Sequence, residues 1–257
     1  MAVKQGKIFT VTSMKGGTGK TTTVLNLAGI FKQMGKKVLI VDMDFYGSAV
    51  AASLNLDGDR SIYNVVDDLT NNRFDYIDNY VLSYDADIDV LAAPKDPRIA
   101  TKIGSKYLGI ILTKASMKYD VLLVDTNYVI DENKLIILDH SDEIVYLMTN
   151  DPIDIKNMKS MISIYKDMDK KNHKIVLNEA IDHNRSYFNK YDIKNIMKDN
   201  VDYTIPSSFH IKSIDKFVLD GKIMTLDKTV QLKNKKAMKN FDLIAKALLR
   251  EKKEKKK

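Results

Sequence analysis

A glycine-rich stretch near the amino end contains the residue types that bind phosphate. It runs Ser13-Met14-Lys15-Gly16-Gly17-Thr18-Gly19-Lys20-Thr21-Thr22, after an apolar, β-branched run at 8–12 and before a run with helical periodicity. Closely spaced glycines allow successive backbone N–H groups to point at one anion, and the helix that begins there adds the positive end of its dipole. Lys20 has the length to reach the β- and γ-phosphates, and the Thr21 hydroxyl can bind Mg²⁺. The stretch therefore predicts a site for a nucleoside triphosphate.

One lysine indicates which class of phosphate loop this stretch belongs to. A phosphate loop does not require a lysine before its first glycine, and Lys15 occupies that position. The run Lys15-Gly16-Gly17-Thr18-Gly19-Lys20-Thr21 resembles the deviant Walker A motif of the MinD/ParA family of ATPases. In that family the early lysine crosses a dimer interface to contact the partner subunit's nucleotide. The resemblance implies a homodimer when ATP is bound, with Lys15 and Lys20 catalytic and with nucleotide contacts from Gly16, Gly17, Thr18, Gly19, Lys20, Thr21 and Thr22.

Acidic residues follow two later apolar runs. Asp42 and Asp44 come after the run 38–41, and Asp125 ends the run 121–125. Strand ends in a sheet of this type face the nucleotide crevice, where carboxylates suit Mg²⁺. Asp42 and Asp44 resemble the family's Asp-x-Asp at switch I, which implies that Asp44 positions the attacking water and Asp42 supports the metal. Asp125 resembles the Walker B aspartate, so the implied Mg²⁺ residues are Thr21, Asp42 and Asp125.

Both switch segments depart from the usual family pattern. Phe45-Tyr46-Gly47 stands where ParA proteins usually have Pro-Gln-Gly, and Asn127-Tyr128 replaces the prolines or glycine of switch II. These departures leave open whether the protein hydrolyses ATP or binds it with little turnover.

Two later residues are candidates for contacts with the base. Asn178 ends the apolar run 174–178, and an amide can donate to one atom of adenine and accept from another. The segment that includes Pro206 resembles the part of the family that closes over the base. We therefore expect Asn178 and Pro206 to bind the nucleotide, although a strand-ending asparagine in a turn is also ordinary.

Composition excludes several classes of protein. The chain has no cysteine, so it has no disulfides, no thiolate metal site and no ligands for an iron–sulfur cluster. It has no signal-peptide pattern and no apolar run near the roughly 18 residues of a membrane span, which favours a cytoplasmic protein. Residues 250–257 contribute +4 of the net charge of +7. This basic tail could contact an anionic membrane or nonspecific DNA, or could simply be a disordered solubilising segment.

Short apolar runs alternate with helical stretches, which predicts a doubly wound α/β fold with a mostly parallel sheet of seven to eight strands. We expect one domain over 1–249, with a disordered tail over 250–257. The predicted strands are 7–12, 37–41, 88–92, 120–124, 143–148, 174–177 and 202–205. The predicted helices are 20–33, 101–117, 152–168, 190–198, 210–219 and 235–249, with shorter ones near 47–54, 61–69 and 132–139. Gly35 should end the first long helix, and Asp151-Pro152 should begin another.

The resemblance implies an ATP- and Mg²⁺-dependent dimerising ATPase that acts as a spatial switch, with slow hydrolysis stimulated by a partner protein. Ser141-Asp142-Glu143 and Thr149-Asn150-Asp151-Pro152 look closest to the TadZ/CpaE-type pilus-localisation ATPases and to MinD. Two alternatives stay open. One is a ParA-type partitioning ATPase that binds nonspecific DNA; the other is a nucleotide-gated scaffold with little hydrolysis. The location would be cytoplasmic, with peripheral binding to a membrane or the nucleoid as an option.

Overall fold

The computed structural model describes residues 5–180, 188–209 and 214–250. These residues form one eight-stranded sheet with the order β3-β4-β2-β5-β1-β6-β7-β8. Neighbouring strands run parallel except β3 and β4, which are antiparallel. The strands are β1 (Lys7–Thr12), β2 (Val38–Asp42), β3 (Leu82–Ser83), β4 (Ile88–Leu91), β5 (Val121–Asp125), β6 (Glu143–Met148), β7 (His173–Asn178) and β8 (Tyr203–Ile205). The predicted α/β class with a mostly parallel sheet is confirmed.

Helices follow most of the strands. The α-helices are α1 (Lys20–Gln33), α2 (Val50–Ser53), α3 (Ile62–Thr70), α4 (Leu108–Ser116), α5 (Glu132–Asp139), α6 (Pro152–Asp167), α7 (Lys190–Met197), α8 (Ile214–Leu219), α9 (Lys228–Lys233) and α10 (Lys235–Leu249). Short 3₁₀ turns are η1 (Ile77–Tyr80), η2 (Pro97–Lys102), η3 (Ser105–Tyr107), η4 (Ser207–Phe209) and η5 (Met224–Leu226).

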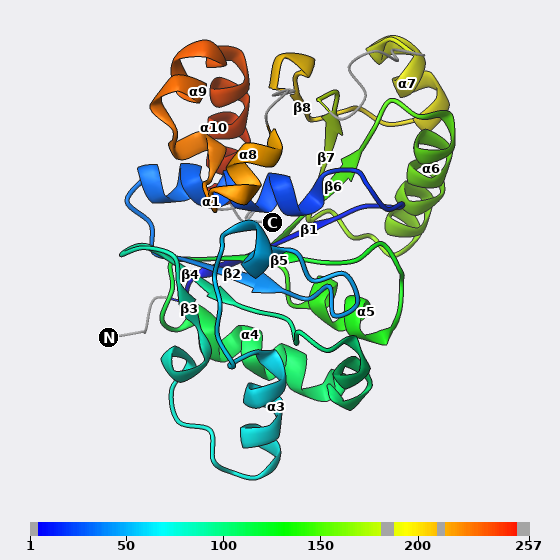
Figure 1. The fold of residues 1–257 in the computed structure, drawn as a ribbon. Helices are drawn as coiled ribbons and strands as arrows, with labels where there is room; N and C mark the ends of the chain where they lie inside the picture. The colour runs from blue at the N-terminus through cyan, green and yellow to red at the C-terminus, as the bar shows by residue number, and fades with distance from the viewer. Residues whose placement is uncertain (1–4, 181–187, 210–213, 251–257) are drawn as a thin grey trace.

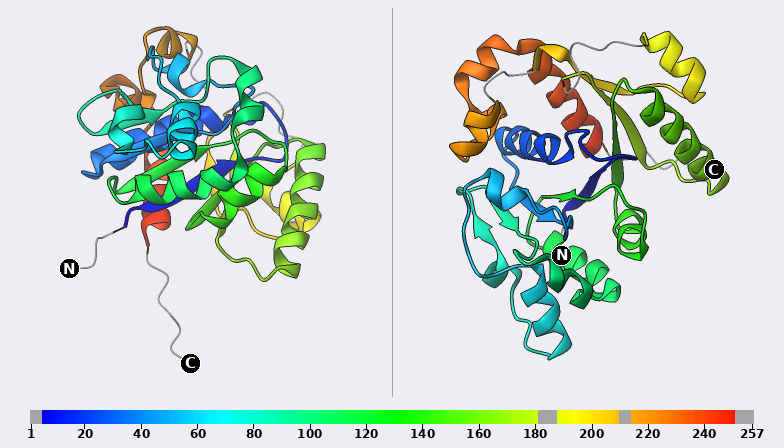
Figure 2. Two further views of the ribbon diagram at one scale, coloured as in Figure 1. Left: turned by 90° about the horizontal axis from the view of Figure 1, so that it is seen from below. Right: turned by 45° about the vertical axis from the view of Figure 1, so that its right-hand side comes forward.

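The helices cover both faces of the sheet, as Figures 1 and 2 show, with α1 and α10 on one side and α3 and α4 on the other. Because side chains alternate along a strand, one strand supplies both cores. Phe9 and Val11 of β1 pack in the α1 and α10 core, whereas Ile8 packs in the core with α3 and α4. A third cluster joins α6 and α7 to β6 and β7. Burial on both faces explains why the central strands are continuous apolar runs.

The strand register brings the predicted acidic residues together. Asp42 at the end of β2 is paired with Asp125 at the end of β5, and Asp125 is also paired with Val11 of β1. The loop that follows β1 therefore lies at the same carboxyl edge of the sheet as both aspartates. This edge is where ligands bind in open α/β sheets.

Most predicted elements are confirmed, including the end of the first long helix at Gly35 and the start of α6 at Asp151. Gly35 follows α1 with φ of 71°, and the Asp151 side chain caps α6 ahead of Pro152. The predicted helix 101–117 is wrong over its first third, because extended backbone at Ile103 and Gly104 separates η2 from η3 and α4. Residues 210–213 of the predicted helix 210–219 lie outside the described residues.

Among the strands and α-helices of the described residues, β3 and α9 were not predicted. β3 has two residues, too few to show alternation, and forms the antiparallel sheet edge with β4. α9 is a six-residue helix capped by Asp227. Short elements of this kind depend on tertiary contacts more than on a local pattern.

Gly29 of α1 allows the segment 223–226 to pack against that helix. A Cβ at Gly29 would contact the Thr225 hydroxyl and would lie 2.9 Å from the Ile223 side chain. The same segment is fixed by Asn26, whose Oδ1 accepts from Thr225 N at 3.0 Å. The close approach between α1 and η5 therefore depends on the absence of a side chain at position 29.

We expect Gly29→Ala to lower the free energy of unfolding by about 1–3 kcal/mol through overpacking, although alanine favours the helix by about 1 kcal/mol. Chemical denaturation measures this. The matched control is Gly109→Ala in α4, where the three atoms nearest to the new Cβ all belong to the ring of His140, an exposed side chain at the end of a different helix. Equal or greater stability of Gly29→Ala would contradict this packing.

No helix in the described ranges is long and apolar enough to cross a membrane.

Candidate functional site

The loop between β1 and α1 has the backbone geometry of an anion cradle. Gly17 and Gly19 have φ of 73° and 88°, in the left-handed region that favours glycine. Thr23 N donates to Gly19 O at 2.9 Å and closes the first turn of α1. Within the described residues, the N–H groups from Gly17 to Thr22 donate to no protein acceptor. The first turn of a helix leaves such donors free for a ligand, so the loop can hold a phosphate.

Lys20 is held at the base of this loop. Its Nζ donates to Ser13 Oγ at 3.1 Å, and Ser13 Oγ donates to Lys15 O at 2.6 Å. Burial lowers the pKa of Lys20, and the charges of Asp125 and Asp44 oppose this shift. The ammonium group is therefore placed among carboxylates at the carboxyl edge of the sheet, where a bound phosphate would add further negative charge.

The two strand-end aspartates are almost fully buried. Thr21 Oγ1 donates to Asp125 Oδ2 at 2.5 Å, and Asp125 is 1% exposed. Burial raises the pKa of Asp42 to about 6. Burial and then the charge of Asp42 raise the pKa of Asp125 to about 7. Two adjacent buried carboxylates are unfavourable without a counter-charge, so this pair indicates a site for a cation.

The donor set fits Mg²⁺. Among the described residues, Asp125 Oδ1 is buried and has no hydrogen-bond partner. Together with the Thr21 hydroxyl it offers hard oxygen ligands, which Mg²⁺ prefers. When bound, the ion would neutralise phosphate charge. Asp42 is less free, because its Oδ1 accepts from Asp44 N at 3.1 Å and its Oδ2 accepts from Ser48 Oγ at 3.0 Å. Asp42 therefore shapes the switch I loop, and its supporting role toward the metal stays a prediction.

Asp44 lies in the loop after β2 and is half-buried. Its Oδ1 accepts from Gly47 N at 2.9 Å, which closes a tight turn. The charge of Asp44 acts on both Lys20 and Asp125. The structure therefore brings Asp44 to the same edge as the phosphate loop, as predicted, and the role of this carboxylate with water stays a prediction.

Lys15 lies at the mouth of the loop. Its Nζ is 3.6 Å from Asp151 Oδ1, and both side chains are about one-third exposed. Asp151 caps α6 by accepting from Ile153 N and Asp154 N at 3.0 Å each. The N–H of Asp154 and, to a lesser extent, the charge of Lys15 lower the pKa of Asp151. Asp151 was predicted only as a helix start, and its contact with Lys15 was missed, since 136 residues separate the two.

Asn178 and Pro206 lie beyond the other end of the loop. Asn178 pairs with Ile205 in the sheet register, which places Pro206 beside the end of β7. Asn178 Nδ2 donates to Thr18 O at 2.9 Å, and its Oδ1 accepts from Ala180 N at 3.1 Å. The buried amide thus supports the phosphate loop directly. Contact of Asn178 and Pro206 with a base stays a prediction.

Lys134 is the main residue of this site that sequence reasoning missed. It is 3% exposed, on the first turn of α5, and its Nζ donates to Asn127 O at 3.0 Å. Burial, followed by repulsion from Lys20, lowers its pKa to about 8. An isolated lysine on a predicted helix is usually exposed, so the only signal that could have found it is its position nine residues after Asp125.

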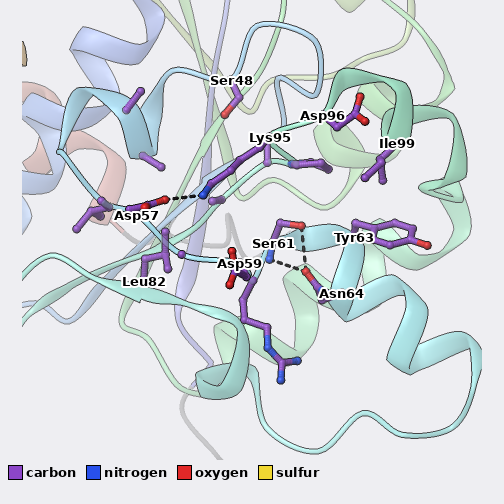
Figure 3. A pocket seen from close by; sticks show the side chains of 18 of the residues that line it. Ser48, Asp57, Asp59, Ser61, Tyr63, Asn64, Leu82, Lys95, Asp96 and Ile99 are labelled. Atoms are coloured by element: carbon purple, nitrogen blue, oxygen red, sulfur yellow. Dashed lines mark hydrogen bonds and ion pairs between the residues drawn. The ribbon is translucent and has the colours of Figure 1, made fainter.

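A separate cleft of about 880 Å³ lies beside switch I and contains none of the predicted site residues. Figure 3 shows Lys95 reaching across this cleft to Asp57. It also shows the hydrogen bond that Ser61 N donates to Asn64 Oδ1 at the start of α3. Ser48 lines this cleft and also donates to Asp42. The backbone geometry and the charges therefore identify the phosphate loop as the candidate nucleotide site. The cleft of about 880 Å³ lies next to this site and is not part of it.

Curated relatives match part of this chain. Tyrosine-protein kinase YwqD of Bacillus subtilis (strain 168) is 32% identical over 124 residues, which are 48% of this chain and 51% of that protein. Sporulation initiation inhibitor protein Soj of the same organism is 30% identical over 132 residues, 47% of this chain and 49% of that protein. The chain thus spans about half the length of these relatives.

Solved structures match nearly all of this chain. A ParA family ATPase from Chlorobium tepidum TLS superposes with a TM-score of 0.78 at 19% identity, covering 93% of this chain and 98% of that one. The septum site-determining protein MinD of Pyrococcus horikoshii OT3, complexed with Mg-ADP, gives 0.76 at 19% identity, covering 95% and 96%. At these identities the likeness establishes a shared fold.

The family model of the CobQ/CobB/MinD/ParA nucleotide-binding domain matches residues 9–218. That range is most of the chain and includes the phosphate loop, both switch I aspartates and Asp125. The resemblance found in the sequence is therefore confirmed. This chain belongs to the CobQ/CobB/MinD/ParA family of nucleotide-binding domains.

Proposed function

We propose that this protein is an ATP- and Mg²⁺-dependent ATPase that dimerises on ATP and acts as a positional switch. The ATP-bound dimer would occupy a surface or a partner, and slow hydrolysis, stimulated by a partner protein, would release it. Lys20 and the loop N–H groups would stabilise charge on the phosphates, and Asp44 would orient water.

The position of Lys15 carries this proposal. Its ammonium group lies at the mouth of the loop, 3.6 Å from Asp151 Oδ1. The ammonium group of Lys20, by contrast, lies at the base of the loop, where it donates to Ser13 Oγ. A lysine at the mouth can extend to a nucleotide held by a second subunit. Exposed apolar side chains come from the segments around this mouth, as expected for a face that another copy covers: Tyr46, Tyr128, Val129, Ile130 and Ile153.

The experiment is sizing by light scattering with ADP, ATP and a slowly hydrolysed ATP analogue. We expect a monomer with ADP, a dimer with the analogue, and a monomer for Lys15→Ala in every case, because the dimer then lacks the cation that crosses the interface. Lys171→Ala is the matched control, since Lys171 is exposed and pairs with nearby Asp169 in the loop before β7. A monomeric wild type with every nucleotide would contradict the proposal.

The process that the switch serves is proposed as pilus-type or division-type positioning, as in TadZ/CpaE and MinD. The alternative is ParA-type partitioning on nonspecific DNA. Other proteins similar to part of this chain are a septum site-determining protein MinD and a chromosome partitioning protein ParA, so the relatives support either process. The basic residues 251–257 lie outside the described residues. ATP-dependent binding to anionic liposomes would favour the first function, and ATP-dependent, salt-sensitive retention on DNA would favour the second.

A second candidate is a nucleotide-gated scaffold with little hydrolysis. Tyr46 is 65% exposed and Tyr128 is 52% exposed, and the Tyr128 ring packs beside Gly16. An aromatic ring beside the loop could exclude water from the site or could block a stimulating partner. ATP turnover that is stimulated by a partner and lost in Asp44→Ala would exclude the scaffold.

A further inference from the structure

Lys134 is a buried cation that makes no ion pair with a carboxylate of the described residues. Its side chain is 3% exposed, yet among the described residues no carboxylate lies within ion-pair distance of its Nζ. The ammonium group has three N–H donors, and the one hydrogen bond found for it in the described chain goes to Asn127 O. Burying an ammonium group is unfavourable unless an anion compensates it.

The local structure places this lysine between switch I and switch II. Asp131 caps α5 by accepting from Lys134 N at 2.9 Å, so Lys134 lies in the first turn after switch II. Its side chain lines a small internal space with Met43, Phe45 and Tyr46 of switch I and with Thr126 and Asn127 of switch II. Lys134 therefore lies between the two segments that flank the predicted metal site.

Its charge also acts on the site. Lys134 is repelled by Lys20 and attracted first by Asp131, the residue that caps α5, and then by Asp44. Asp44 also attracts Lys20, and among the described residues its side chain accepts one hydrogen bond, from Gly47 N. Two ammonium groups, those of Lys20 and Lys134, therefore act on the site that contains Asp44. An anionic ligand bound at this site would stabilise both charges.

From this arrangement we propose that Lys134 distinguishes a nucleoside triphosphate from a diphosphate by supplying, from the same subunit, an additional cation for the terminal phosphate. This inference rests on the proposed ATP-binding function and assigns to that site a specificity residue on α5. The hydrogen bond to Asn127 O would then couple the terminal phosphate to the backbone of switch II.

The alternative is that Lys134 only holds the Asn127 carbonyl in place. The two roles predict opposite effects on the ligand-free protein. Replacing an uncompensated buried charge by an apolar isostere is neutral or stabilising, whereas loss of a needed donor to a buried carbonyl is destabilising.

The test uses Lys134→Met, which removes the charge, Lys134→Gln, which keeps an N–H donor, and Lys134→Arg, which keeps the charge. Titration calorimetry measures the affinities for Mg-ADP and for a magnesium complex of a slowly hydrolysed ATP analogue, and thermal unfolding is followed without nucleotide. Lys156→Met is the matched control, because Lys156 is an exposed lysine on α6.

We expect Lys134→Met and Lys134→Gln to lower the preference for the triphosphate by about 10- to 100-fold, the range of a charge-assisted hydrogen bond. Their affinity for Mg-ADP should be unchanged, and Lys134→Met should unfold at the same temperature as wild type or higher. Lys134→Arg and Lys156→Met should keep the preference. If Lys134→Met does not fold, Lys134→Gln supplies the comparison.

An unchanged triphosphate preference in Lys134→Gln would overturn the inference. So would an equal loss of both affinities with a lower unfolding temperature, which is the result of a structural role. These outcomes are distinct from failure of the proposed function itself, in which wild type would bind neither nucleotide.

Discussion

Asp44→Asn should lower ATP turnover by about 10²- to 10⁴-fold while leaving ATP binding and the ATP-dependent dimer intact. The factor is that of a group which positions or deprotonates the attacking water. Asparagine keeps an oxygen that can accept from Gly47 N, the 2.9 Å hydrogen bond that closes the switch I turn. The variant therefore removes the negative charge of the carboxylate and keeps the conformation of the switch I turn.

Single-turnover hydrolysis and sizing should be measured on the same preparation. Asp139→Asn is the matched control, since Asp139 is exposed at the end of α5, where its partner is Lys170. If Asp44→Asn hydrolyses ATP at the wild-type rate, Asp44 is not the water-positioning residue. If wild type itself shows no turnover with or without partners, the scaffold becomes the better account.

Lys20→Met should weaken binding of Mg-ATP by about 10²- to 10³-fold, the effect of removing one preorganised donor to a phosphoryl oxygen. Methionine matches the length of lysine but has no charge. The same substitution leaves the negative charges of Asp44 and Asp125 without the positive charge of Lys20 that compensates them. We therefore also expect lower stability without nucleotide.

Lys32→Met is the matched control for this loss. Lys32 is on the same helix, at its other end, and pairs with Asp85 at 2.7 Å in a solvent-accessible ion pair. Such pairs contribute about 0–1 kcal/mol to the free energy of unfolding. Because Lys32 is in the last turn of α1, away from the phosphate loop, its loss should not change nucleotide affinity. Equal weakening in both variants would show that the effect is a general one of charge or folding.

Much of the site was predictable because the fold itself brings distant residues to one place. In a parallel sheet the loops that follow β1, β2 and β5 must lie at one edge, so the motif at 15–21 and the acids at 42 and 125 could be related without coordinates. The register then pairs Asp42 with Asp125. This part of the site depends on topology, which the alternation of strands and helices already indicates.

The remainder depends on side-chain packing, which has no local signature. Nothing in its neighbours marks Lys134 as buried, and the contact of Lys15 with Asp151 links residues far apart in the chain. The break at Ile103-Gly104 arises because Ile103 is buried in the core with α3 and α4, a requirement that outweighs the local helical pattern. Asn178 was predicted to contact a base, and its hydrogen bond to Thr18 O adds a loop-supporting contact that no pattern indicated.

We expect the loop from Lys15 to Thr22, with the Thr21 hydroxyl and the Asp125 carboxylate, to bind a magnesium nucleoside triphosphate. Isothermal titration of the full chain with Mg-ATP tests it most directly, with Lys20→Met and an EDTA-treated sample beside wild type. We expect one site per chain with measurable heat, with weaker binding in Lys20→Met and less heat when Mg²⁺ is removed. Absence of heat for wild type, or equal binding in Lys20→Met, would contradict it.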